Sequence, residues 1–400
     1  MNDRLVTRPF VLTWLSTFGL LLSIGIQLPV IPLFAAGPLG AGSVGIGIAV
    51  AATAPTAMLL QPIAGRVADR RGRKPLILVG SLLLALALVF YTLVASLPAL
   101  VALRLVAGIG EALVFVATAT IINDLAPDER RGEAVSLYSL AVWGGLAAGP
   151  VLGEAVLGEA ALGEAALGDG AYDTVWLAAT GCALAAGVVA LGLPETRPQS
   201  ARPVGRTPLV HRAALLPGLV LVLGMIGFAG MAAFVPLYAR ELGLGGAGLV
   251  FTLNAVVVIA VRLLGRTIPD RFGPRRAATV AMVLAASGLG VIALVQTPAG
   301  LYSGTVVLAL GQALVFPALM TIVVATAPPA GRSSAVGSFT ACADLGYAIG
   351  AISLGGVAAA AGYSGVFAVA AVAAAAGLLP LTRLRNLSSV PTPAAVDAPP

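Results

Sequence analysis

Long apolar runs without charge constrain this chain more than any other feature. Residues 9–65 contain no Lys, Arg, Asp or Glu, and residues 277–331 form a second such run. Only 10% of the residues are charged and 59% are hydrophobic, whereas soluble proteins carry about 25% charged residues. A soluble fold of this composition could not cover its surface with polar groups, so the sequence predicts an all-α membrane protein.

A membrane-spanning helix needs about 20 apolar residues. By that rule the chain contains twelve transmembrane helices, which we expect near residues 10–34, 43–65, 76–96, 98–123, 133–156, 173–193, 213–239, 247–269, 276–296, 299–326, 332–359 and 364–382. The domains follow from this count: an N-terminal six-helix bundle (1–193), a polar cytoplasmic linker (194–212), a C-terminal six-helix bundle (213–387) and a disordered cytoplasmic tail (388–400).

The basic residues predict the orientation of the chain. When loops are assigned alternately to the two sides of the membrane, 20 of the 23 Lys and Arg residues fall on the side that holds both termini. Cytoplasmic loops carry an excess of Lys and Arg, so both termini are expected in the cytoplasm. The basic residues lie in short loops rather than on one continuous face, which argues against a nucleic-acid partner.

The two halves of the sequence repeat at an offset of 201 residues. Gly110-Glu111-Ala112-Leu113-Val114-Phe115 matches Gly311-Gln312-Ala313-Leu314-Val315-Phe316, and Asp69, Arg70 and Gly72 match Asp270, Arg271 and Gly273. Six helices are an even number, so the copies have the same orientation. The sequence therefore predicts parallel bundles related by a pseudo-two-fold axis along the membrane normal, with a cleft between them.

Few ionisable residues lie within the predicted spans, and each is costly in hydrocarbon. Arg104 and Glu111 share one helix face about 10.5 Å apart along the axis, so water or a neighbouring helix is expected to bridge them. Glu111 and Gln312 occupy equivalent positions of the repeat, and only Glu111 can carry a proton. Glu111 is either a proton-coupling group or a structural polar tie between helices. Asp344 is a second proton site, a counter-charge for a cationic substrate or a structural residue. Arg262 is expected to extend toward the cytoplasmic interface.

Other side chains are candidates for the lining of the central cavity or for helix packing. The expected substrate-cavity residues are Gln27, Phe115, Asn254, Gln312 and Tyr347. The expected helix-packing motif is Gly145, Gly149, Pro150 and Gly153, because small residues four apart allow close helix contact and proline bends a helix. An acidic period-five repeat over residues 152–170 is expected to be a loop expansion outside the membrane.

A charged island separates the first two apolar runs: Gly65-Arg66-Val67-Ala68-Asp69-Arg70-Arg71-Gly72-Arg73-Lys74. It resembles the signature loop between the second and third helices of the major facilitator superfamily of secondary transporters. Three further matches resemble the drug:proton antiporter branch: Pro29-Val30-Ile31-Pro32, Leu100-x-x-x-Arg104-x-x-x-Gly108-x-Gly110, and the Gly145 to Gly153 motif, in which Glu154 stands where a second glycine is common.

The resemblance implies roles for several of these residues. It implies that Arg104 assists proton transfer, and that Asp69 and its arginines lock one conformation by docking to the start of the eleventh span, where a carboxylate is favoured by the helix N-terminus. The expected conformational gate comprises Gly65, Asp69, Arg70, Gly72, Arg73, Asp270 and Arg271.

These patterns lead to one functional hypothesis and its alternatives. We expect a proton-coupled exporter of small amphipathic or hydrophobic compounds, working by alternating access as a monomer in the cell membrane, with protons and the lipid bilayer as further partners and no cofactor or metal. The alternative is a sugar or metabolite transporter of the same superfamily. An enzyme is disfavoured because the single histidine and the absence of metal-ligand spacing offer no catalytic cluster.

Overall fold

The computed structural model describes residues 6–126, 130–163, 169–195, 211–264, 273–327 and 332–384, and the regular secondary structure in these ranges is helical. Ten segments are long and apolar enough to cross a membrane, and one more apolar helix has 17 residues. The prediction of an all-α membrane protein is therefore confirmed. Most of the linker 194–212, the tail 388–400 and the gate residues Asp270 and Arg271 lie outside the described residues.

The helices of residues 8–191, called the first half below, lie together. They are α1 (Arg8–Gln27), α2 (Val30–Ala36), α3 (Ser43–Ala51), α4 (Thr53–Arg71), α5 (Lys74–Tyr91), α6 (Leu97–Leu125), α7 (Arg131–Gly163) and α8 (Asp169–Leu191). The first and second predicted spans each consist of two helical pieces. Proline cannot donate to the helix ladder, and Pro29 stands at the break between α1 and α2.

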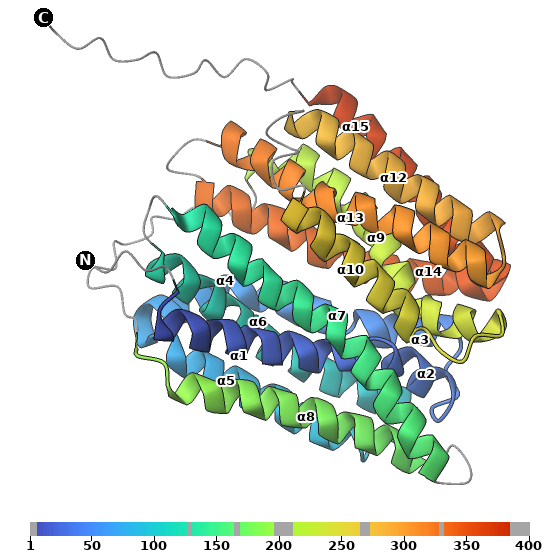
Figure 1. Cartoon of the computed structure of the whole chain (residues 1–400), viewed down its shortest axis with the longest axis horizontal. Coiled ribbons are helices and arrows are strands. Elements are labelled where there is room, and N and C mark those ends of the chain that lie inside the picture. Colours follow the sequence, from blue (N-terminus) through green and yellow to red (C-terminus); the bar gives the residue numbers. More distant parts are fainter. Residues whose placement is uncertain are drawn as a thin grey trace, which may run out of the picture.

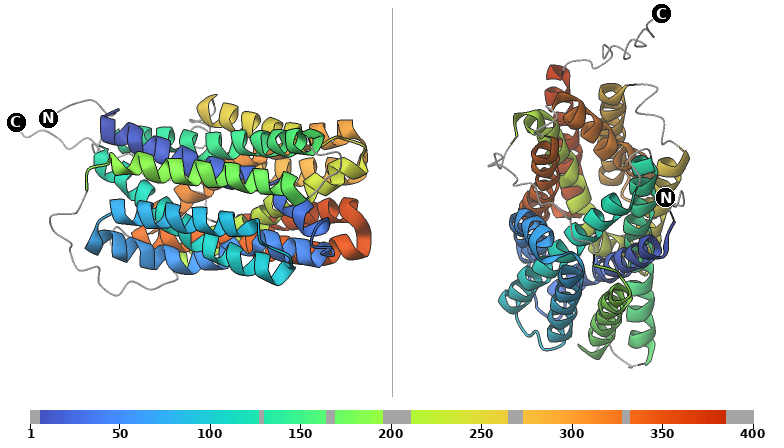
Figure 2. Two further views of the ribbon diagram at one scale, coloured as in Figure 1. Left: turned by 90° about the horizontal axis from the view of Figure 1, so that it is seen from below. Right: turned by 90° about the vertical axis from the view of Figure 1, so that its left-hand side faces the viewer.

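The helices of residues 212–384, called the second half, form a neighbouring group. They are α9 (Arg212–Glu241), α10 (Gly248–Leu264), α12 (Pro274–Leu294), α13 (Pro298–Thr326), α14 (Arg332–Ala376) and α15 (Leu378–Arg383). Figure 1 shows the first half below and the second half above, and the end-on view in Figure 2 shows the same separation.

Helix α14 is 45 residues long and contains a break at Gly362, where φ is 70°. A straight helix of this length would measure about 68 Å at 1.5 Å per residue, more than twice the thickness of the hydrocarbon core. The break lies between the predicted spans at 332–359 and 364–382. Only glycine adopts such a positive φ readily, so this residue allows the chain to leave one helical segment and start the next.

The packing of the two halves follows the sequence repeat. Both ends of α13 lie 201 residues after the ends of α6, and the equivalent glycines Gly72 and Gly273 both have positive φ, 95° and 82°. Helix α7 packs against α1 in the first half, and α14 packs against α9 in the second. The same residues at the same spacing therefore produce the same local packing.

The acidic repeat differs from its prediction. Helix α7 continues as far as Gly163 and α8 starts at Asp169, so the first part of residues 152–170 is helical and the expected loop expansion was wrong there. Leu, Ala and Glu are strong helix formers, and one glycine in five does not outweigh them. Residues 164–168 lie outside the described ranges.

Candidate functional site

A cavity of about 210 Å³ lies between the two halves of the molecule. Nine of its fifteen lining residues are apolar, and the other six are polar or charged. These six are Gln27, Thr53, Arg104, Glu111, Asp344 and Tyr347. All six come from α1, α4 and α6 of the first half and from α14 of the second, and all but Thr53 were singled out in the sequence.

The two carboxylates reach the cavity from opposite halves. Glu111 extends from α6 and Asp344 from α14, and both side chains are partly buried. Helix α6 packs closely on α5, where a Cβ built on Gly110 would lie 2.6 Å from the Gly80 carbonyl oxygen. This tight packing fixes the helix, and thereby the direction of Glu111, toward the cavity.

Among the described residues that line the cavity, Arg104 is the one cation, and it is buried with only 7% of its surface exposed. Its Nη2 donates a hydrogen bond of 3.2 Å to the carbonyl oxygen of Val50, and Nε is buried without a partner. The guanidinium is therefore held by the backbone of α3 through Nη2. Arg104 and Glu111 both line the cavity, and the expected bridge between them, through water or a neighbouring helix, stays a prediction.

A hydrogen bond links the halves next to the cavity. Gln61 Nε2 of α4 donates to Asp344 Oδ2 of α14 over 3.1 Å. The sequence analysis did not single out Gln61. It lies four positions before Gly65 in a run that carries no charge, and an uncharged amide there was the only signal that could have marked it.

Three of the predicted cavity residues lie elsewhere. Asn254 Nδ2 donates to Gln312 Oε1 over 3.0 Å, which joins α10 to α13 within the second half, and neither residue lines the cavity. The Phe115 ring faces Tyr138, with 6.4 Å between ring centroids. Phe228, by contrast, lines the cavity beside Tyr347.

Arg262 also differs from its expected position. Its guanidinium carbon lies 4.4 Å from the centre of the Trp143 ring of α7, so the side chain packs across the boundary between the halves instead of extending toward the interface. A cation over the face of an indole ring is attracted by the ring quadrupole. Trp143 is the repeat partner of Asp344, which places an aromatic ring and a carboxylate at equivalent positions of the two halves.

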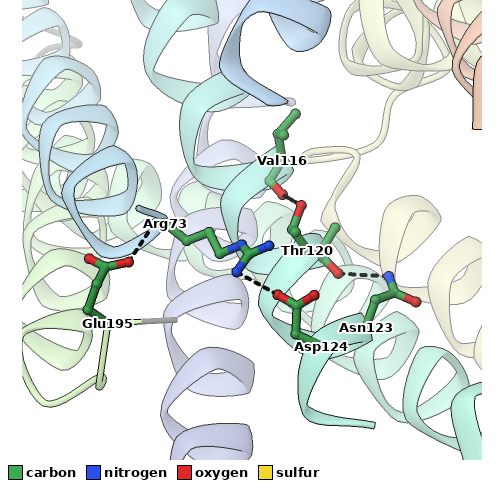
Figure 3. Close-up of polar contacts among 7 residues, drawn as sticks. Arg73, Val116, Thr120, Asn123, Asp124 and Glu195 are labelled. Carbon is green, nitrogen blue, oxygen red and sulfur yellow. Dashed lines mark hydrogen bonds and ion pairs between the residues drawn. The ribbon is translucent and has the colours of Figure 1, made fainter. Parts of the chain in front are cut away.

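Arg73 of the charged island takes part in a polar cluster with Asp124 and Glu195 (Figure 3). The Arg73 guanidinium makes an ion pair of 2.9 Å with Asp124 at the end of α6, and the Arg73 backbone N–H donates to Glu195 Oε1 over 2.8 Å. Lys74 Nζ donates to the Leu191 carbonyl oxygen at the end of α8. These contacts tie the start of α5 to the ends of α6 and α8 in the same half.

The remaining predicted gate residues are only partly described. Gly65 lies inside α4, Arg70 is exposed near its end, and Gly72 ends the helix with φ of 95°. A Cβ on Gly72 would overlap the Glu195 carboxylate, so this glycine is needed for both conformation and space. The side chain of Asp69 lies outside the described part of the chain, and its docking to the eleventh span stays a prediction.

The glycine motif of α7 lies against α1. A Cβ on Gly145 would lie 2.8 Å from Leu21 Cβ, and Gly149 and Gly153 face the backbones of Gly25 and Ile26. Pro150 lies inside the helix at the same contact. The two helices touch backbone to backbone, which small residues allow.

Comparisons with known proteins agree with this architecture. The chain is 34% identical over 357 residues to an uncharacterized MFS-type transporter of Burkholderia mallei, with 87% of this chain and 84% of the relative covered. It is 32% identical over 336 residues to an uncharacterized MFS-type transporter of Salmonella typhimurium, with 82% and 83% covered.

Solved structures share the fold at low sequence identity. The nucleoside transporter NupG superposes with a TM-score of 0.77 at 14% identity, covering 94% of this chain and 99% of the other. A bacterial homolog of the human lysosomal transporter Spinster gives 0.75 at 15% identity, with 96% of each chain covered. The human organic anion transporter MFSD10 gives 0.70 at 20% identity, covering 94% and 99%.

A family model establishes the relationship. The model described as Major Facilitator Superfamily matches residues 13–299 and, in a second match, residues 245–399. Together with the relatives above, it confirms the family predicted from the charged island and makes the chain a multi-pass membrane transporter rather than an enzyme. The protein belongs to the Major Facilitator Superfamily.

Proposed function

We propose that this transporter is a proton-coupled exporter of small amphipathic or hydrophobic compounds in the cell membrane. The observation that supports this most is the joint lining of one cavity by Glu111, Arg104 and Asp344. Buried ionisable residues in membrane proteins mark proton and substrate pathways. The mostly apolar wall, with two carboxylates against one arginine, favours an amphipathic substrate and especially one with a positive charge.

The proposed architecture has twelve crossings. Division of α14 at Gly362 and inclusion of α10 add two crossings to the ten long segments. The repeat in sequence and packing then relates two six-helix bundles, 1–193 and 213–387, by a pseudo-two-fold axis along the membrane normal. The excess of basic residues supports a cytoplasmic location for both termini, and we propose that the monomer is the functional unit.

Alternating access follows from the position of the cavity. Substrate and ion sites of such transporters lie at the interface between the repeats, and rocking of one repeat against the other opens the site to either side. Glu111 and Asp344 belong to different halves, so the rocking changes the environment of each carboxylate. A change in environment is what allows a carboxyl group to bind a proton on one side and release it on the other.

The test uses purified protein in liposomes that contain a pH-sensitive dye. A panel of lipophilic cations, neutral amphiphiles, sugars and nucleosides is added to vesicles with and without a proton gradient. Proton movement driven by lipophilic cations, and abolished by a protonophore, is the expected result. Transport of sugars or nucleosides in the absence of any response to amphiphiles would favour the metabolite-transporter alternative and overturn the proposal.

A further inference from the structure

The carboxylate of Glu154 bridges the two halves at the end of the molecule remote from the charged island. It accepts a hydrogen bond of 2.6 Å from the backbone N–H of Ala247 and a second one from that of Gly248. Glu154 lies in the last third of α7, and α10 begins at Gly248. One side chain of the first half therefore binds the first turn of a helix in the second half.

The local sequence is suited to this contact. The first N–H groups of a helix have no partner within the helix, and a negative charge is stabilised there by the helix dipole. A Cβ on Gly246 or Gly248 would lie only 2.5 or 2.7 Å from Glu154 Oε2, so the glycines leave the space that the carboxylate occupies. Arg240, at the end of α9, adds a favourable positive charge nearby.

Glu154 and the start of α10 are each held by other contacts within their own half of the molecule. Glu154 directly follows Gly153, which packs against Ile26 of α1. Helix α10 is joined to α13 by the Asn254–Gln312 hydrogen bond. If one half moves relative to the other, these internal contacts persist, and the bonds from Glu154 to α10 must break.

The backbones of α3 and α14 also meet at this boundary. A Cβ on Gly355 of α14 would lie 2.7 Å from the Ser43 carbonyl oxygen and 2.9 Å from Val44 Cα. Gly47 of α3 approaches Ala351 of α14 in the same way. These contacts involve small residues and can separate without the loss of a hydrogen bond to a charged group. The hydrogen bonds to a charged side chain at this end of the boundary are those of Glu154.

We propose that Glu154 is a latch that holds this end of the transporter closed and is released when the end opens. The proposal rests on the proposed alternating access, but not on the identity of the substrate or on proton coupling. The position is one at which this chain departs from the drug-exporter motif, in which a second glycine is common. In this chain position 154 carries a carboxylate that binds the other half, and this contact can break and form again.

The test measures the distance between the two halves in the purified full-length protein in lipid nanodiscs. Cys182 and Cys342 are replaced by alanine, and spin labels are attached through Gly158→Cys on α7 and Leu249→Cys on α10. Electron–electron double resonance then reports the separation at this end. Glu154→Ala is expected to transfer population to a longer distance, with a change in the closed-to-open ratio of roughly tenfold or more, since hydrogen bonds to charged groups are among the strongest.

Three further variants keep the test decisive. Gly248→Ala retains Glu154 but fills the space of its carboxylate, and it should shift the distances in the same direction. Glu133→Gln, in an exposed ion pair with Arg130 near the opposite end of α7, is the matched control and should change nothing. Glu154→Gln preserves the shape of the side chain if the alanine variant folds poorly.

An unchanged distance distribution in both Glu154→Ala and Gly248→Ala would overturn the latch. The measurement needs no substrate and no proton gradient. A protein that shows the expected shift but transports none of the amphiphiles would retain the latch and refute the proposed exporter function.

Discussion

Gln61 of α4 and Asp344 of α14 are joined by a hydrogen bond of 3.1 Å although 283 positions separate them in the chain. The bond connects the two halves at the cavity wall, and Asp344 is one of its two carboxylates. Any movement that separates α4 from α14 must break this bond. We therefore expect the protonation of Asp344 to influence the relative position of the halves.

Gln61→Leu should loosen the contact between α4 and α14. A hydrogen bond to a charged partner contributes about 1.5–3 kcal/mol, so the removal should increase amide hydrogen exchange in both helices around these positions. Gln27→Leu is the matched control, because Gln27 lines the same cavity but donates only to Ser23 within its own helix. Equal exchange in the two variants would contradict a role of Gln61 in joining the halves.

Glu111→Gln should abolish substrate-driven proton movement. The amide cannot exchange a proton, while its size and hydrogen-bonding shape are close to those of the acid, so the helix should fold as before. The measurement is dye-reported proton flux in liposomes, with flux reduced to that of protein-free vesicles. Gln312, at the equivalent position of the repeat, lies outside the cavity, so Gln312→Asn is the control and should retain the proton flux. A retained proton flux in Glu111→Gln would show that Glu111 is a structural tie.

Gly72→Ala should destabilise the protein. Its φ of 95° is costly for any residue with a Cβ, by about 1–3 kcal/mol, and the added Cβ would overlap the Glu195 carboxylate. Thermal unfolding in detergent, followed through the native tryptophans, measures the effect. Gly181 in α8 has open space around its Cα, so Gly181→Ala is the control and should be neutral or stabilise the protein by about 0.4–1 kcal/mol. A lower melting temperature in both variants would point to a general intolerance of substitution.

Gly149→Val should disrupt the packing of α1 on α7. The new side chain would be forced into the backbone of Gly25, and overpacking of this kind costs about 1–3 kcal/mol. The expected result is a lower melting temperature and a reduced yield of monodisperse protein. Gly158→Ala, farther along α7 with nothing near its Cβ, is the control, and an equal loss there would show that the effect comes from the helix itself.

The sequence by itself determined the class of the protein. The charge-free runs were enough to predict a membrane protein, because the cost of burying charge in lipid acts on local composition and needs no knowledge of the fold. The superfamily was predicted from the resemblance of the island at residues 65–74 to its signature loop. The repeat likewise paired Gly72 with Gly273, and the backbone at both positions has positive φ. Arg104, Glu111, Asp344, Gln27 and Tyr347 were singled out because polar groups within apolar runs are conspicuous.

Only the tertiary structure decided which of these groups meet. Asn254 and Gln312 satisfy each other away from the cavity, and Arg262 packs on Trp143. Gln61 and Glu154 acquire their importance from partners that lie 283 and 93 positions away. A hydrogen bond depends on distances of about 3 Å between atoms, and periodicity along one helix cannot specify such a distance to a helix from the other half.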